Sequence, residues 1–254
     1  RVLVCVHGLT RNGRDFDALA EAMSAHYRVI CPDVVGRGQS GHLRDPAAYG
    51  IPQYVADMVT LIARLNVDTV HWVGSSMGGL IGMALAAQEG TPIRKLVLND
   101  VGPVITAESL NRIGTYVGTN PDWATFEEAL AFVKFVSAPF GALTEAQWHH
   151  LTETSVMQRP DGRWVFRYDP RIAEPFRAAF ADQDVNLWPL YEQIKTPTLV
   201  IRGAESDLLT RDTWEKMGSC GPLAKLAEIE KVGHAPMFQS EDQIAIVRDF
   251  LLSA

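Results

Sequence analysis

The stretch VHWVGSSMGGLIGMAL, residues 70–85, joins a short β-branched run directly to an apolar helical pattern. No turn signal separates the two, so we predict a strand that passes straight into a helix with Ser76 at the corner. A serine at such a corner has a strained backbone. Glycine two residues before and after it, at Gly74 and Gly78, leaves room for the turn. The stretch therefore predicts a serine nucleophile whose hydroxyl stands clear of a sheet, at the mouth of a cleft.

The helix that starts after Ser76 favours the same chemistry. The first N–H groups of a helix have no helical partners, and the positive end of the helix dipole points toward the corner. The Met77 N–H can therefore stabilise the oxyanion that forms when a substrate carbonyl is attacked. A G-x-S-x-G pattern also arises by chance. The prediction of a serine nucleophile therefore requires that the rest of the chain contain a base and an acid.

Composition narrows the class of protein. The 254 residues are 47% hydrophobic and carry a net charge of −7, which is typical of a globular chain with a large core. No basic run is present, so we expect neither nucleic acid nor a membrane surface as a partner. No apolar stretch reaches the roughly 20 residues that span a bilayer.

The three cysteines are Cys5, Cys31 and Cys220. Their number is odd, and none has the spacing of a metal site or of a disulfide framework. We therefore predict no disulfide, no metal and no cofactor, and a reducing, cytoplasmic location.

Strand and helix patterns alternate at both ends of the chain. Apolar runs that read as strands lie at 1–7, 27–31, 95–99, 198–203 and 226–229, in addition to the run before Ser76. Such alternation predicts an α/β fold with a mostly parallel, doubly wound sheet. Ligands bind at the carboxyl ends of such strands, which is the edge where we expect His7, Asp33, Ser76 and Asp100.

The alternation stops between residues 103 and 186. Capping-box patterns start helices at Thr125 and Thr144, and the pair Asp161-Gly162 predicts a short hairpin. We predict a core of residues 1–102 and 187–254, with residues 103–186 inserted as a mainly helical cap over the strand ends. Most of the cap's aromatic side chains should form its own core and a minority should line a pocket: Tyr116, Trp123, Phe126, Phe132, Phe135, Phe140, Trp148, Trp164, Phe166 and Phe176.

Serine needs a base to accept its proton as it attacks. Among the seven histidines, His234 follows the last predicted strand, in a loop marked by glycine and proline. It should therefore reach the same edge as Ser76, and we predict that it is the base. Surface or packing roles are assigned to His26, His71, His149 and His150.

A third group must hold the imidazole in the correct tautomer and offset its charge. Asp207 follows the strand 198–203, and Asp100 follows the strand 95–99. Both positions lie at the correct edge, and either is physically feasible. We take Asp207 as the first candidate and Asp100 as the alternative.

Five motifs together resemble the α/β-hydrolase superfamily, in particular its capped bacterial esterases and enol-lactonases. They are HGLT (7–10), DVVGRGQS (33–40), GSSMGG (74–79), LVIRGAESD (199–207) and VGHAP (232–236). The resemblance covers essentially the whole chain. It implies Ser76 as nucleophile, His234 as base and Asp207 as acid, with an oxyanion hole formed by the backbone N–H groups of Leu9 and Met77. It also implies a structural role for the loop 33–40.

Two features depart from the family pattern. The family normally begins with an antiparallel hairpin before the strand that ends in His-Gly, whereas this sequence begins on that strand. We therefore expect either preceding residues or a shorter sheet. Ser75 stands where relatives that cleave carbon–carbon bonds often have Asn, which argues against that chemistry.

The resemblance implies hydrolysis of a small carboxylic ester or lactone through an acyl-enzyme on Ser76. A serine nucleophile excludes the branches that use aspartate, such as dehalogenases and epoxide hydrolases. Three alternatives stay open: carbon–carbon hydrolysis of ring-fission products, acyl transfer or perhydrolysis with the same triad, and a receptor-like protein that only binds its ligand. Leu9, Met77 and the cap aromatics predict an apolar pocket. Arg37 could reach an anionic substrate, although we favour a structural role for it.

Overall fold

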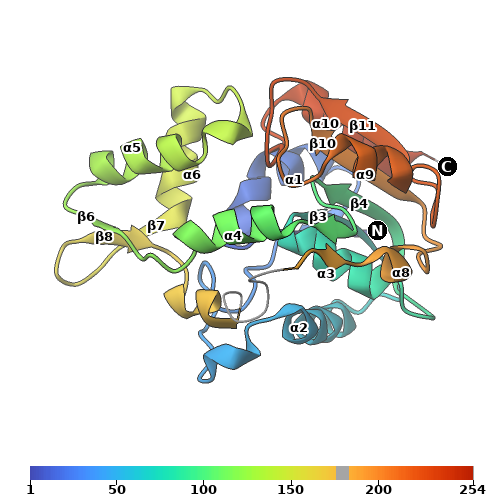
Figure 1. The fold of residues 1–254 in the computed structure, drawn as a ribbon, viewed down its shortest axis with the longest axis horizontal. Coiled ribbons are helices and arrows are strands. Elements are labelled where there is room, and N and C mark those ends of the chain that lie inside the picture. Colours follow the sequence, from blue (N-terminus) through green and yellow to red (C-terminus); the bar gives the residue numbers. More distant parts are fainter. Residues whose placement is uncertain (176–182, 254) are drawn as a thin grey trace.

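The computed structural model describes residues 1–175 and 183–253, and a six-stranded parallel sheet runs through it (Figure 1). The strand order is β11-β10-β4-β3-β1-β2, and every pairing in this sheet is parallel. All six predicted strands are present: β1 (Val2–Val6), β2 (Arg28–Ile30), β3 (Val70–Ser75), β4 (Ile93–Asn99), β10 (Thr198–Gly203) and β11 (Lys225–Ile229). The prediction of an α/β fold built on a parallel sheet is confirmed.

The two faces of the sheet bury separate hydrophobic clusters. In β1, Val2, Val4 and Val6 belong to one cluster, and Leu3 and Cys5 belong to the other. Successive side chains of a strand point to opposite faces, so a continuous apolar run such as VLVCV fits only a strand that is covered on both sides. This is why the apolar runs of the sequence predicted the central strands well.

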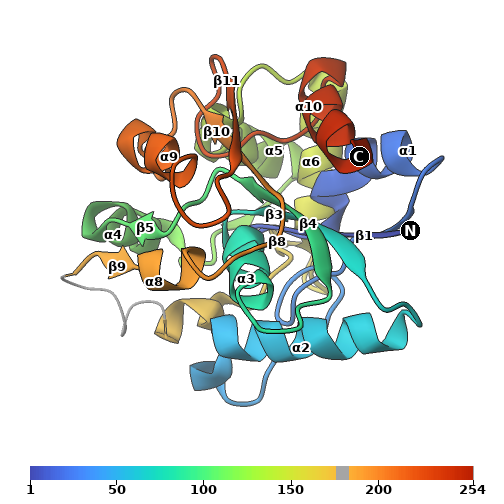
Figure 2. The ribbon, with the colours of Figure 1, turned by 90° about the vertical axis from the view of Figure 1, so that its right-hand side faces the viewer.

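Helices cover both faces, as expected for a doubly wound sheet. One face carries α2 (Ile51–Arg64), α3 (Met77–Ala86), α8 (Trp188–Tyr191) and α9 (Arg211–Met217), and the other carries α1 (Asp17–Met23) and α10 (Glu241–Leu252). Figure 2 shows α1 and α10 on one side of the sheet and α2 and α3 on the other. The sheet is therefore the middle layer of three.

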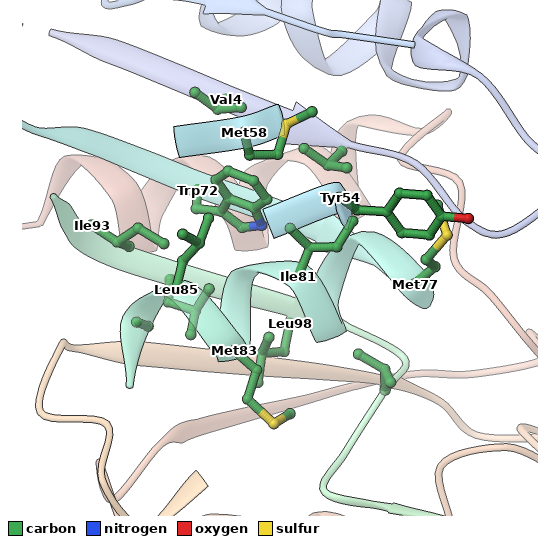
Figure 3. Packing of buried hydrophobic residues seen from close by; sticks show 14 of the residues in the cluster. Val4, Tyr54, Met58, Trp72, Met77, Ile81, Met83, Leu85, Ile93 and Leu98 are labelled. Atoms are coloured by element: carbon green, nitrogen blue, oxygen red, sulfur yellow. The ribbon is translucent and has the colours of Figure 1, made fainter. Parts of the chain in front are cut away.

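Trp72 of β3 is the largest fully buried side chain beneath α2 and α3. Figure 3 shows it beside Met58 of α2 and Ile81 of α3. Its indole N–H donates to the Gly78 carbonyl at 3.0 Å, so the one polar atom of the ring is satisfied. This packing seats the first turn of α3 on β3 and thereby fixes the corner between them.

The buried stripe of α2 differs from a stripe through Val55, Met58, Val59 and Ile62, which its sequence spacing suggests. The structure buries Tyr54, Met58 and Ile62, whereas Val59 is 47% exposed. The helix is rotated so that the Tyr54 hydroxyl faces the buried guanidinium of Arg37, at 2.8 Å from Nη1. A polar contact thus decides between two apolar faces that spacing alone does not separate.

Most of segment 103–186 lies to one side of the sheet, where Figure 1 shows α5 and α6 beside the small sheet of β6, β7 and β8. Its elements are β5 (Val104–Ile105), α4 (Ala107–Tyr116), β6 (Asp122–Trp123), α5 (Phe126–Val136), α6 (Glu145–Ser155), β7 (Val156–Gln158), β8 (Trp164–Phe166) and β9 (Val185–Asn186). The expected hairpin is the antiparallel pair β7–β8, with Gly162 at a φ of +84° in its turn. The structure also contains the antiparallel pairings β6–β8 and β5–β9, which the sequence patterns do not predict.

Both expected helix starts are capped by their threonines. Thr144 and Gln147 form a complete capping box. Thr125 accepts from the Glu128 N–H, but the Glu128 carboxylate accepts from Ala124 instead of Thr125. The division of the chain into a core and a cap, with the boundaries given above, stays a prediction. Phe176, one of the cap aromatics, lies outside the described residues.

The aromatic side chains of this segment pack mainly on one another, as predicted. Trp123 contacts Phe132 and Phe166, and Phe126 contacts Trp164. Phe135 points to solvent at 80% exposure. Among the described residues, no helix is both long and apolar enough to cross a bilayer.

Candidate active site

The strand-to-helix corner at Ser76 has the predicted strained geometry. Ser76 has φ of +51° and ψ of −116°, a region that L-residues rarely adopt. A Cβ on Gly74 would overlap the Gly78 carbonyl, and a Cβ on Gly78 would overlap the carbonyl of Val6 in β1. The two glycines are therefore required for β3, α3 and β1 to meet this closely, and Ser76 projects toward a cavity.

His234 lies in the loop between β11 and α10 and contacts Ser76. Its Nε2 is 3.0 Å from the Ser76 Oγ, and its Nδ1 is 2.7 Å from Oδ2 of Asp100. A carboxylate only accepts, so Nδ1 carries the proton, which leaves Nε2 free to accept the Ser76 hydroxyl proton. This is the arrangement that an activated serine requires.

Asp100 follows β4 and is fully buried. Its Oδ1 accepts from the Gly203 N–H at 2.8 Å, and its Oδ2 accepts from the Ser206 hydroxyl at 2.6 Å as well as from His234. These hydrogen bonds compensate the carboxylate for its loss of water. These contacts hold the Asp100 carboxylate in place beside the imidazole of His234.

The structure does not bring our first candidate for the acid, Asp207, to His234. The Asp207 side chain is 53% exposed and forms an ion pair with Arg112 of α4. The residue before it, Ser206, turns inward to Asp100 instead, so the side chain of Asp207 is directed away. The preference for Asp207 over Asp100 is thus corrected: the alternative residue has the contact with histidine.

The residues expected to form the oxyanion hole lie beside the serine. Leu9 follows β1, Met77 begins α3, and both line the same cavity as Ser76 and His234. Within the described part of the chain, neither backbone N–H has a hydrogen-bond acceptor. Both donors are therefore free for a substrate oxygen.

His7 makes a contact that the sequence did not reveal. Its Nε2 accepts from the Val34 N–H at 2.9 Å, so Nδ1 carries the proton and donates to the Gly8 carbonyl at 2.7 Å. The Gly8 carbonyl and the Leu9 N–H belong to one peptide group. His7 therefore fixes the orientation of the Leu9 N–H, and the only sequence signal for this was its place before Gly8 at the strand end.

Burial makes His7 a source of pH-dependent stability. Desolvation lowers the pKa of His7 to about 4, against about 6.5 in an unfolded chain. Below pH 6.5 the unfolded chain therefore takes up a proton that the folded chain refuses until about pH 4, so stability falls as the pH is lowered through this window. We expect His7 to reduce the free energy of unfolding by roughly 2 kcal/mol between pH 7 and pH 5.

The measurement is urea unfolding of the wild type and of His7→Gln at both pH values. Since glutamine does not titrate, the variant should lose less stability than the wild type on acidification, although it starts from a lower value. His26→Gln, at an exposed position, should keep the wild-type pH dependence. Equal losses in the wild type and His7→Gln would show that His7 is not the titrating group.

Arg37 has the structural role that we favoured. It is fully buried, and its guanidinium donates to the carbonyls of Leu9 and Val35 at 2.8 Å each. It does not reach an anionic substrate, because its charge is enclosed between these groups and the Tyr54 ring. Its contact with the Leu9 carbonyl is a second hydrogen bond, besides those of His7, that holds the turn after β1.

Asn99 ties the nucleophile to the histidine loop. Its Nδ2 donates to the Ser75 hydroxyl at 2.7 Å and to the Pro236 carbonyl at 2.8 Å. Its backbone carbonyl accepts from the Ser76 N–H at 3.0 Å. These three contacts link β3, β4 and the loop that carries His234. Sequence reasoning missed this residue, because an asparagine at a strand end has no distinctive pattern.

The cavity in front of Ser76 measures about 840 Å³, a size typical of small-molecule sites. Its walls are mostly apolar and come from both the sheet edge and segment 103–186. Phe132, Phe140 and Phe166 are among its aromatic residues. Across residues 1–175 and 183–253, no cluster of His, Cys, Asp and Glu side chains could hold a metal ion.

Comparison with known proteins decides the family. A family model described as the alpha/beta hydrolase fold matches residues 1–241. The chain belongs to the α/β-hydrolase family. The resemblance predicted from its motifs is therefore confirmed, and this α/β hydrolase is an enzyme, as expected.

Individual relatives agree with this assignment. The α/β hydrolase is 51% identical to the 3-hydroxybutyrate-oligomer hydrolase of Cupriavidus necator, over its whole length and 89% of that protein. It is 25% identical to the 2-hydroxy-6-oxo-2,4-heptadienoate hydrolase of Pseudomonas putida, over 90% of this chain and 80% of the other. A crystal structure of an alpha/beta hydrolase from Novosphingobium aromaticivorans superimposes with a TM-score of 0.89 at 37% identity, covering 98% of this chain and 88% of that one.

Proposed function

We propose that this α/β hydrolase cleaves carboxylic esters through an acyl-enzyme on Ser76, and that its substrates are short oligomers of a 3-hydroxy acid. The observation that carries the proposal is the hydrogen-bonded series of Ser76, His234 and Asp100 at an apolar cavity. The 51% identity to a 3-hydroxybutyrate-oligomer hydrolase supports this substrate class. The relative named for a different hydrolysis, 2-hydroxy-6-oxo-2,4-heptadienoate hydrolase, is only 25% identical.

The first half of the reaction forms the acyl-enzyme. The Ser76 Oγ attacks the ester carbonyl carbon while His234 Nε2 takes the hydroxyl proton. The N–H groups of Leu9 and Met77 stabilise the negative charge on the carbonyl oxygen. When the intermediate collapses, the carbon–oxygen bond to the leaving group breaks, and His234 gives its proton to the departing alkoxide, which leaves as an alcohol.

The second half returns the enzyme to its starting state. His234 takes a proton from water, and the hydroxide attacks the acyl carbon. The tetrahedral intermediate then collapses, and Ser76 recovers its proton from His234 as the acid leaves. In both halves the imidazole is transiently charged, and the buried Asp100 carboxylate offsets that charge at 2.7 Å.

Hydrolysis in water enriched in ¹⁸O tests this reaction. With the linear dimer of 3-hydroxybutyrate, we expect two monomers, with one ¹⁸O atom in the newly formed carboxylate and none in the newly formed hydroxyl group. This result follows because water attacks an acyl carbon. The proposal would be contradicted if the folded protein cleaved neither this dimer nor 4-nitrophenyl butyrate. It would also be contradicted by ¹⁸O in the newly formed hydroxyl group.

A further inference from the structure

Among the described residues, two arginines line the cavity, Arg11 and Arg112, and they differ in how firmly they are held. Arg11 forms two hydrogen bonds with Asp15, of 2.9 and 2.6 Å, and lies over the Phe140 ring. The side chains of this pair are only 14% and 9% exposed. Arg11 is thus neutralised and fixed as part of the wall.

Arg112 lies on α4 and is held much more loosely. Its side chain is 46% exposed, and its one ion-pair partner among the described residues is the equally open Asp207. Half-exposed ion pairs are weak because water screens them and both side chains lose freedom. A ligand carboxylate can therefore take the place of Asp207, and the planar guanidinium suits that exchange because it binds a carboxylate with two hydrogen bonds.

The position of the Arg112–Asp207 pair is set by contacts with the candidate active site. Ser206 donates to Asp100, and Asp207 comes next in the chain. The Ser109 hydroxyl of α4 donates to the Asp207 carbonyl at 3.0 Å, which fastens α4 to this loop. Arg112 therefore has a defined place on the cavity wall, next to the loop whose Ser206 contacts Asp100.

The net charge of the protein makes a cation in the cavity important for binding an anionic substrate. The protein carries a net charge of −7, so a substrate with a free carboxylate is repelled by the field of the molecule as a whole. The rest of the cavity wall is mostly apolar and offers a carboxylate little compensation for its lost water. A loosely paired guanidinium on the wall supplies both attraction and compensation.

We propose that Arg112 binds the terminal carboxylate of an anionic ester substrate, and that Asp207 competes with the substrate for Arg112. The proposal rests on the proposed ester hydrolysis and adds to it a preference for the free acid over its neutral ester. Asp207, whose expected role as the acid is filled by Asp100, is in this arrangement a regulator of substrate affinity.

The test compares kcat/KM for the linear 3-hydroxybutyrate trimer with kcat/KM for its methyl ester, in low salt. Arg112→Gln should lower the ratio of kcat/KM for the free acid to kcat/KM for the methyl ester about fivefold to tenfold. Asp207→Asn should raise the ratio about twofold to fivefold, because the competitor for Arg112 has lost its charge. Arg14→Gln is the matched control, since Arg14 is exposed and pairs with Asp17, and it should keep the wild-type ratio.

Three other outcomes would each contradict one of the proposals. A ratio unchanged in both Arg112→Gln and Asp207→Asn would overturn recognition by Arg112 and leave ester hydrolysis intact. Loss of kcat on both substrates in Asp207→Asn would make Asp207 the acid and overturn its role as competitor. Hydrolysis of neither substrate by the wild type would contradict the proposed function, and recognition by Arg112 with it.

Discussion

Replacement of Ser76 by alanine lowers kcat for a short-chain ester by about 10⁴- to 10⁶-fold, according to the proposed mechanism. The variant has no Oγ to form the acyl-enzyme, while the cavity and the N–H groups of Leu9 and Met77 stay in place. The remaining activity should be the small acceleration that binding and the oxyanion donors provide by themselves. Steady-state kinetics with 4-nitrophenyl butyrate measures the loss.

The control for this prediction is Ser24→Ala, at an exposed position outside the cavity, which should keep wild-type kcat. Thermal unfolding should show that Ser76→Ala is folded, since alanine adds no atoms to the corner. A Ser76→Ala variant that keeps more than about a tenth of wild-type kcat would mean that another group is the nucleophile.

We expect replacement of Asp100 by asparagine to lower kcat by about 10³- to 10⁴-fold. Asparagine fills nearly the same space but can donate its amide N–H to His234 Nδ1. The imidazole proton then lies on Nε2, and a protonated Nε2 cannot accept the proton of Ser76. The variant thus removes the correct tautomer without removing the histidine.

Asp207→Asn is the comparison that tests the assignment of the acid. On the neutral substrate 4-nitrophenyl butyrate, its loss of kcat should be at least about a hundredfold smaller than that of Asp100→Asn. The opposite order of the two losses would restore Asp207 as the acid and would mean that the hydrogen bond between His234 and Asp100 is not the one used in the reaction.

The sequence predicted the parts of the site that local pattern determines. The spacing of Gly74, Ser76 and Gly78 requires a tight corner, and the structure contains that corner with the backbone strain expected of it. His234 was predicted because only its loop combined the end of a strand with glycine and proline punctuation. In both cases the chain neighbours of a residue contain enough information to place it.

The choice between Asp100 and Asp207 could not be made in this way. Both residues follow strands that end at the same edge of the sheet, and the decision depends on which side chain turns inward. It is made by contacts between distant residues, the inward hydrogen bond from Ser206 to Asp100 and the ion pair of Asp207 with Arg112. Sequence spacing carries no information about either contact.

The same limit applies to the supporting residues. His7 contacts the Val34 N–H in the loop after β2, and Asn99 contacts the Pro236 carbonyl in the loop after β11. These loops come within reach only when β1 pairs with β2 and when β10 joins β4 to β11. The rotation of α2 likewise depends on the contact between Tyr54 and Arg37. Local pattern predicts which elements form, and tertiary contacts decide which of their side chains meet.

The measurement that tests the central claim most directly is intact-mass analysis after treatment with a fluorophosphonate, on the wild type and on Ser76→Ala. A serine activated by His234 should displace fluoride and form a covalent phosphonyl ester. We predict one adduct per chain in the wild type and none in Ser76→Ala. No adduct on the folded wild type, or an adduct of equal extent on the variant, would contradict the claim that Ser76 is the activated nucleophile of this hydrolase.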